Sequence, residues 1–192
     1  NGGRLMTVAI IVQARMSSDR LPGKVLAPIS GRPLLGHLLD RLGRVRGALG
    51  PVVATSDRSE DDAIESFCAS VTVPCHRGSR DDVALRLEEA AAEAGADAIA
   101  RVCADSPVLD PALVVEAIET FEVAQPDLVT NTFPRTYPKG QSVEVIDVDA
   151  LRALRPDMND GDREHVTRAF YRRPDQWRIV SMTGGADHSA LQ

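Results

Sequence analysis

The sequence predicts an α/β fold, a three-layer α/β/α sandwich built around a mostly parallel sheet. Short apolar runs rich in β-branched residues, such as TVAIIVQ (7–13), are typical of strands buried on both faces. Segments with helical periodicity alternate with these runs, which is typical of βαβ units. With 192 residues, 43% of them hydrophobic, the chain is long enough to bury one substantial core.

The same patterns assign the elements in order along the chain. Further strands are expected over 51–55, 97–103, 127–131, 142–148 and 177–182, and helices over 33–46, 60–70, 81–94, from 111 onward and over 162–173. The expected N-caps of the second, third and fourth helices are Ser59, Ser79 and Asp110, with Pro111 as the first helical residue of the fourth.

The composition argues against several classes of protein. A formal net charge of −6 argues against non-specific binding to duplex nucleic acid, which relies on a basic face. The three cysteines occur in no CxxC spacing, so neither a zinc site nor a disulfide framework is indicated and we expect a cytoplasmic protein. No apolar stretch approaches the roughly 20 residues that cross a bilayer, so no membrane association is expected.

The loop after the first strand, QARMSSDRLPGK (13–24), is the main candidate site. In open parallel sheets, the loop after the first strand is the usual phosphate cradle. The spacing matches neither a Walker loop nor the GxGxxG dinucleotide fingerprint. The loop carries Arg15, Arg20 and Lys24 beside a Pro-Gly turn that frees backbone amides, and this composition suits a triphosphate. The alternative is that these charges form a solvated basic surface.

A second candidate site follows the strand expected over 97–103. Asp105, followed by Ser106 and Pro107, can reach the mouth of the sheet where magnesium and phosphate would meet. Mg²⁺ takes one or two carboxylates together with phosphate oxygens, so one aspartate is enough to begin a site. The alternative is an aspartate that caps a turn before proline.

Five sequence blocks resemble those of a known enzyme family. The first, QARMSSDRLPGKVLAPISGRPLLGHLLDRL, resembles the signature of the sugar-acid cytidylyltransferases. It is most similar to the spore coat polysaccharide biosynthesis cytidylyltransferase-like family, which is related to CMP-Kdo synthetase and acylneuraminate cytidylyltransferase. The blocks RGSRDDVALR, ARVCADSPVLDP, YPKGQSVEV and DREHVT follow in the order of that family. The resemblance implies a homodimer and one nucleotidyltransferase domain over 1–192 with a Rossmann-like, GT-A-like sheet.

The resemblance also implies roles for residues of this chain. The catalytic residues would be Arg15, Lys24 and Asp105, with Mg²⁺ bound by Asp105. The nucleotide would contact Gln13, Ala14, Arg15, Ser18, Arg20 and Lys24, with Arg77, Gly78 and Ser79 near the base and ribose. The acceptor would contact Tyr137, Lys139, Gly140 and Glu144. The alternatives are a helix cap for Ser79 and an exposed turn for Lys139, and no catalytic role is assigned to Glu164 or His165.

The chain departs from the family pattern at two positions and at its end. Asp19 weakens the positive potential of the phosphate loop unless an arginine neutralises it, and Gln141 stands where an apolar residue is usual. We expect the C-terminal end of the family domain, with its second metal-binding aspartate, to lie beyond residue 192.

The activity implied is transfer of CMP from CTP to a hydroxyl of a sugar or sugar acid, with release of pyrophosphate, for surface polysaccharide or other glycan synthesis. One alternative is a nucleotide-sugar-dependent glycosyltransferase, which would need a DxD metal motif. The triplet DVD (147–149) formally supplies one, although Asp149 is expected to cap the helix that follows. The other alternative is a non-catalytic nucleotide-binding relative, motivated by Asp19 and the second carboxylate expected beyond residue 192.

Overall fold

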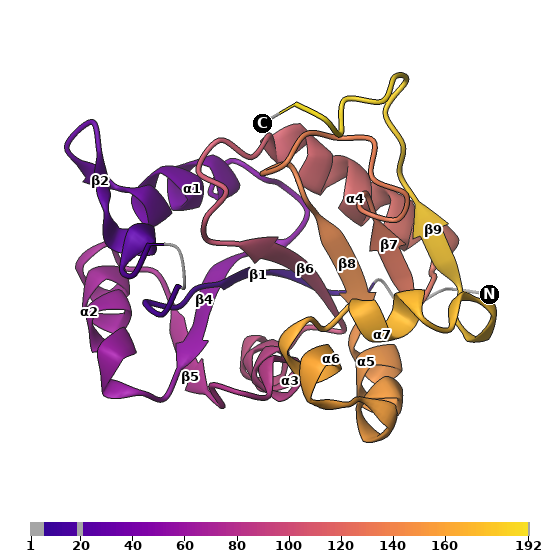
Figure 1. Cartoon of the computed structure of the whole chain (residues 1–192), viewed down its shortest axis with the longest axis horizontal. Helices are drawn as coiled ribbons and strands as arrows, with labels where there is room; N and C mark the ends of the chain where they lie inside the picture. The colour runs from indigo at the N-terminus through magenta and orange to yellow at the C-terminus, as the bar shows by residue number, and fades with distance from the viewer. Residues whose placement is uncertain (1–5, 19–20, 192) are drawn as a thin grey trace.

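A seven-stranded sheet forms the centre of the molecule (Figure 1). The structure is a computed structural model and describes residues 6–18 and 21–191. The strands of the sheet are β1 (Val8–Gln13), β4 (Leu49–Ser56), β5 (Cys75–Gly78), β6 (Ala98–Cys103), β7 (Leu128–Thr130), β8 (Glu144–Asp147) and β9 (Ile179–Ser181). The helices are α1 (Leu34–Leu42), α2 (Asp62–Ser70), α3 (Val83–Ala94), α4 (Pro111–Ala124), α5 (Val148–Leu154), α6 (Asp160–Glu164) and α7 (Arg168–Tyr171). A small hairpin pairs β2 (Pro28–Ile29) with β3 (Arg32–Pro33).

The sheet is mostly parallel, as the sequence predicts. Its strand order is β5-β4-β1-β6-β8-β7-β9, and β8 runs antiparallel to both of its neighbours while the other pairs are parallel. From β1 the chain passes outward to β4 and β5 on one side and then returns to β6 on the other side. Strand order therefore reverses at β1, and ligands of open α/β sheets bind at the carboxyl ends of the strands beside such a reversal.

Helices cover both faces of the sheet, which confirms the predicted three-layer sandwich (Figure 1). Along β1 the side chains alternate between the two layers. Val8, Ile10 and Val12 join the core cluster that contains residues of α1, α2 and α4, whereas Ala9 and Ile11 join the cluster that contains residues of α3 and α5. All five side chains are at most 1% exposed, which explains why β1 is a nearly continuous apolar run rather than an alternating one.

Three expected helix caps are wrong, and one is confirmed. Asp110 accepts a hydrogen bond from the amide of Ala112 at the start of α4. A 3-10 turn, Ser59–Asp61, precedes α2 in place of a Ser59 cap. Aspartates cap the other two helices: Asp82 rather than Ser79 caps α3, and Asp147 rather than Asp149 caps α5.

Two further differences between the prediction and the structure concern whole helices or strands. The helix expected over 162–173 is divided into α6 and α7, and β5, which was not predicted, forms the edge of the sheet. Among the described residues, no helix is long and apolar enough to cross a membrane.

Ion pairs connect α3 to the helices that follow β8. Glu88 of α3 accepts hydrogen bonds from Arg152 at 2.9 Å and from Arg155 at 2.6 Å. Asp82 accepts one from Arg163 at 2.5 Å, which fixes α6 beside the start of α3. Burial acts to raise the pKa of Glu88, but the two arginines outweigh it, and the pKa lies below its ordinary value.

We predict that the stabilising effect of Glu88 disappears in acid. Because its folded-state pKa is lowered, the carboxylate stabilises the fold above its unfolded-state pKa, and this contribution is lost as the pH falls through the folded-state value. Glu88→Gln should lower the free energy of unfolding by about 1–2 kcal/mol at pH 7, and the difference from the wild type should shrink at acidic pH. Urea unfolding across this pH range measures it, with exposed Glu60→Gln as the control. A difference that does not change with pH would contradict the role of the carboxylate charge.

Candidate active site at the carboxyl ends of β1 and β6

The loops after β1 and β6 meet in a direct ion pair. Lys24 Nζ lies 2.5 Å from Asp105 Oδ2, and the two side chains are 24% and 42% exposed. Gly23 adopts a φ of 72°, in the left-handed region that glycine accepts, and the 3-10 turn Lys24–Leu26 begins directly after it. The two candidate sites found in the sequence are therefore one site.

The second cation of the β1 loop pairs with a helix distant in the sequence. Arg15 Nη1 lies 3.1 Å from Glu164 Oε1 at the end of α6, and both side chains are about two-fifths exposed (41% and 44%). Each pair is open to solvent, where an ion pair contributes roughly 0–1 kcal/mol. An anion with several charged oxygens can therefore replace these carboxylates at little cost.

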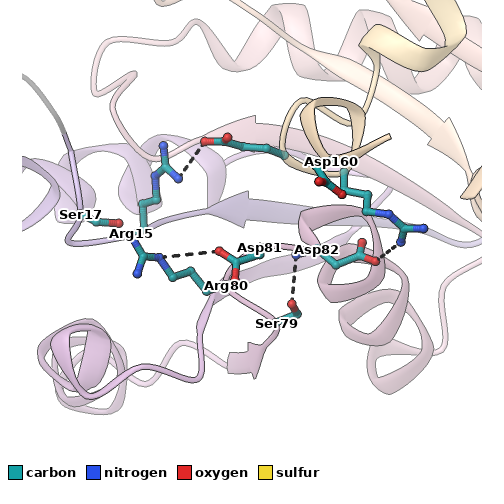
Figure 2. A pocket seen from close by; sticks show the side chains of 9 residues that line it. Arg15, Ser17, Ser79, Arg80, Asp81, Asp82 and Asp160 are labelled. Carbon is teal, nitrogen blue, oxygen red and sulfur yellow. Dashed lines mark hydrogen bonds and ion pairs between the residues drawn. The ribbon is translucent and has the colours of Figure 1, made fainter. Parts of the chain in front are cut away.

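Two neighbouring hollows lie on either side of the Arg15–Glu164 pair, which lines both. The first, here called the α3 hollow, measures about 750 Å³ and is shown in Figure 2; it is lined by Arg15, Ser17, Ser79, Arg80, Asp81, Asp82, Asp160, Arg163 and Glu164. The second, the β1–β6 hollow, measures about 580 Å³ and is lined by Gln13, Arg15, Ser17, Ser18, Lys24, Val25, Arg101, Cys103, Ala104, Asp105, Glu164 and His165. Together they have room for ligands of the size of a nucleotide and a second small molecule.

A fully buried aspartate holds the β1 loop in place. Asp61 Oδ1 accepts a hydrogen bond from the Met16 amide at 2.7 Å, and Oδ2 accepts bonds from the Ser56 amide, at 3.1 Å, and from the Ser56 hydroxyl. The Gly23 amide donates to the Met16 carbonyl at 2.8 Å and closes the loop. The backbone directly after Arg15 and directly before Lys24 is thereby tied to the end of β4. Asp19 and Arg20, the remaining charged residues of the loop, lie outside the described residues.

A polar network lies beneath the β1–β6 hollow. Arg101 donates from two nitrogens to Gln13 Oε1 and from a third to Glu144 Oε2. Burial would lower the pKa of Arg101, but the pKa is raised on balance, with the Glu144 carboxylate acting in that direction, so the guanidinium stays charged. Arg101 is not among the site residues predicted from the sequence, although a charged residue inside the apolar run of 97–103 is a signal that could have indicated it.

Cys103 also lines the β1–β6 hollow, beside this network. Burial raises the pKa of its thiol, in spite of the opposing effect of Arg101. The thiolate is the nucleophilic form of cysteine, so this protonated thiol is not suited to covalent catalysis.

The residues predicted near the base and ribose separate into different environments. Ser79 lines the α3 hollow. Arg77 is directed to α2, where its guanidinium donates to Asp62 at 2.6 Å and Glu65 at 2.8 Å. Buried Arg86 supports the wall of the hollow by donating to the Ser79 carbonyl at 2.7 Å. Neither Arg77 nor Gly78 lines the two hollows.

Ala14, Tyr137, Lys139, Gly140 and Glu144 do not line either hollow. Ala14 is buried in the core at 2% exposure, and its amide donates to the Ala54 carbonyl. Glu144 is 4% exposed and is held by Arg101. Roles for these five residues in binding nucleotide or acceptor stay predictions.

Gln141 connects the predicted acceptor segment to the Asp105 loop. Its side-chain oxygen accepts a hydrogen bond from the Asp110 amide at 2.9 Å, and its nitrogen donates to the Val108 carbonyl at 3.1 Å. Gln141, which stands where an apolar residue is usual, therefore joins its own loop to the loop that follows Asp105.

Asp105 fits a magnesium ion only in part. Within residues 6–18 and 21–191, no group of three or more His, Cys, Asp or Glu side chains could hold a metal by itself. Magnesium commonly takes one or two carboxylates and completes its octahedron with water and substrate phosphates. The half-exposed Asp105 carboxylate fits that second arrangement, with Lys24 as the competitor for one of its oxygens.

The triplet DVD lies at the opposite end of β6 from Asp105. Asp147 is paired with Ala98 at the amino end of β6, whereas Asp105 follows the carboxyl end of the same strand. The Asp147 carboxylate accepts the Ala150 amide as a helix cap. This register excludes a metal-binding role for DVD at the Lys24–Asp105 site.

Comparisons with known proteins agree with this geometry. The sequence profile of the family described as "Cytidylyltransferase" matches residues 9–185. The spore coat polysaccharide biosynthesis protein SpsF of Bacillus subtilis is 31% identical over 182 residues, which make up 90% of this chain and 73% of SpsF. The 3-deoxy-manno-octulosonate cytidylyltransferase of Geobacter sulfurreducens is 37% identical over 115 residues, which make up 59% of this chain and 44% of that enzyme.

A solved structure shows the same architecture. The cytidylyltransferase of Leptospira borgpetersenii superposes with a TM-score of 0.93 at 29% sequence identity, covering 97% of this chain and 80% of that protein. Because the family profile extends over nearly the whole chain, from β1 past β9, the chain belongs to the cytidylyltransferase family, whose members are nucleotidyltransferases.

Proposed function

We propose that this protein transfers CMP from CTP to a hydroxyl group of a sugar or sugar acid and releases pyrophosphate. The observation that carries the proposal is the contact between Lys24 and Asp105, with Arg15 in the wall of the same hollow. This contact places two cations and a carboxylate at the point where strand order reverses. Phosphate groups need such cations, and a divalent ion needs such a carboxylate.

Arg15 and Lys24 bind the phosphates of CTP. In the structure Arg15 is paired with Glu164 and Lys24 with Asp105. Phosphate oxygens replace these partners, and the charge-assisted hydrogen bonds that result are about twice as strong as neutral ones. The two cations then stabilise the negative charge that gathers on the phosphates during transfer.

The chemical step is an in-line displacement at the α-phosphorus. The acceptor hydroxyl oxygen forms a bond to the α-phosphorus, the bond to the bridging oxygen of pyrophosphate breaks, and the hydroxyl proton passes to solvent. Asp105 would hold a magnesium ion together with phosphate oxygens, and the ion would supply positive charge and lower the pKa of a coordinated hydroxyl. Most of the rate enhancement comes from positioning the two reactants, and no covalent enzyme intermediate is needed.

A sugar acid is the acceptor class that the relatives favour. The Geobacter sulfurreducens relative is named for 3-deoxy-manno-octulosonate, which is a sugar acid. The B. subtilis relative is named for spore coat polysaccharide biosynthesis, which supports a role in surface polysaccharide or glycan synthesis. A cytoplasmic location and a homodimer belong to the same proposal.

Assays of pyrophosphate release test the proposal. The four nucleoside triphosphates are each tried with and without Mg²⁺, against a panel of sugar acids, aminosugars and phosphonates. CTP with a sugar acid should release pyrophosphate, and EDTA should abolish the release. CTP binding with no turnover on any acceptor would indicate the non-catalytic relative, and a preference for another nucleotide would overturn the cytidylyl assignment.

We predict that Lys24→Ala lowers turnover by about 100-fold or more, because it removes charge stabilisation from the transition state. The fold should persist, since Lys24 takes part in a half-exposed pair that contributes roughly 0–1 kcal/mol. Arg46→Ala removes an exposed cation just before β4, at the amino end of that strand, and is the charge-matched control. Unchanged turnover in the Lys24 variant would remove the loop from the mechanism.

Asp61 gives this site its preformed shape. Its three hydrogen bonds fix the Met16 backbone before any ligand binds, so the nucleotide does not have to order the loop. Preorganisation of this kind raises affinity because the entropy of ordering is not lost on binding.

We predict that Asp61→Asn weakens CTP binding by about 10-fold. Asparagine has one oxygen, so one of the Met16 and Ser56 amides loses its acceptor, and the free energy of unfolding should fall by about 1–3 kcal/mol. Asp147→Ala is the stability control. Loss of this helix cap should cost about 1 kcal/mol, and Asp147 lies beside the amino end of β6, away from the site. Calorimetric titration with CTP measures both variants. If Asp61→Asn binds CTP like the wild type while its melting temperature falls, the loop does not depend on Asp61.

A further inference from the structure

The side-chain amide of Gln13 is held in one orientation by a buried arginine. Arg101 Nε and Nη2 lie 3.1 Å and 2.9 Å from Gln13 Oε1. A guanidinium group has donors only, so the amide atom that faces it must be the oxygen. The amide nitrogen of Gln13 therefore occupies the other side of the amide group.

Arg101 is itself held in place by Glu144. Its third contact is to Glu144, whose side chain is 5% exposed. Tyr171 donates its hydroxyl hydrogen to Glu144 Oε1 at 2.7 Å, and burial together with Glu144 raises the pKa of this phenol, so it stays protonated. Both Glu144 oxygens are therefore occupied, and the hydrogen bonds of Arg101 to Gln13 and Glu144 restrict the positions that its guanidinium can adopt.

The Gln13 amide nitrogen has no acceptor among the residues that the structure describes. Within residues 6–18 and 21–191, no hydrogen bond from Gln13 Nε2 is formed, while Gln13 lines the β1–β6 hollow beside Lys24 and Asp105. Two N–H groups are therefore available at the end of β1. Polar groups beside a ligand hollow that lack protein partners are groups that a ligand can satisfy.

We propose that Gln13 Nε2 donates a hydrogen bond to a phosphate oxygen of the bound nucleotide, with Arg101 and Glu144 as positioning residues that fix the direction of the donor. This inference rests on the proposed function. A phosphate oxygen is the favoured acceptor because Gln13 lies two residues before Arg15 and lines the same hollow as Lys24. A neutral donor adds an orienting contact to these two cations and places no further positive charge beside them.

Two variants of Gln13 distinguish its role as a hydrogen-bond donor to the nucleotide from its contribution to stability. Gln13→Glu keeps an oxygen for Arg101 but replaces the amide nitrogen with a second carboxylate oxygen, so the melting temperature should stay the same or rise while CTP binding weakens by about 30-fold. Gln13→Met removes donor and acceptor without adding charge, so the melting temperature should fall and CTP binding should weaken by about 10-fold. A merely structural role would move stability and affinity in the same direction in both variants.

Calorimetric titration with CTP, thermal unfolding and the Michaelis constant for the acceptor together test the inference, with Asp147→Ala as the stability-matched control. CTP binding within twofold of the wild type in both variants would overturn it. So would weak binding in Gln13→Glu alone, since an added negative charge acts at a distance. A raised Michaelis constant for the acceptor with unchanged CTP affinity would overturn the choice of a phosphate oxygen. If the wild type itself fails to bind CTP, the proposed function fails first.

Discussion

Strand β1 is hydrogen-bonded to β4 on one side and to β6 on the other, and all three run in the same direction. The residues that follow β1 and β6 must therefore emerge side by side. Gln13 and Cys103 are register partners at the ends of these strands, and the Lys24–Asp105 pair joins the loops that follow. The site depends on this parallel pairing, because 81 residues of sequence separate the two charges and only the sheet brings them together.

Opposite charges neutralise the two cations of the site. Like charges repel each other, and Arg15 and Lys24 are each paired with a carboxylate from another element. Both pairs are partly exposed, so each contributes little to stability and each is easily exchanged. Glu164 and Asp105 hold the two cations in the structure, and in the proposed mechanism the Asp105 carboxylate would bind a metal ion once Lys24 pairs with a phosphate instead.

Much of the fold could be predicted from the sequence, because buried strands and amphipathic helices leave strong periodic patterns. The run 7–13 became β1, and Asp110 with Pro111 began α4. Strand β5 was missed since it is a four-residue edge strand of sequence CHRG, with no apolar alternation. The helix caps were displaced because several Ser and Asp residues precede each helix, and local pattern alone does not choose among them.

The site was predictable where one loop carried several signals, as at Arg15 and Lys24. It was not predictable where one side chain contacts a residue distant in the sequence. Asp61 bonds the amide of Met16 across 45 positions, and Arg101 bonds Gln13 across 88. Such contacts depend on which strands become neighbours, and no local pattern encodes that choice.

Glu164 and Glu144 have the same carboxylate group but differ in burial. Glu164 is 44% exposed in the wall of both hollows, so it can exchange partners when a ligand arrives. Glu144 is 4% exposed, and removing its partner would leave a buried charge without compensation, which is strongly destabilising. Glu144 is therefore confined to one arrangement, and this rigidity is what allows it to fix Arg101 and, through Arg101, the amide of Gln13. The same carboxylate chemistry supports exchange where water is present and orientation where water is excluded.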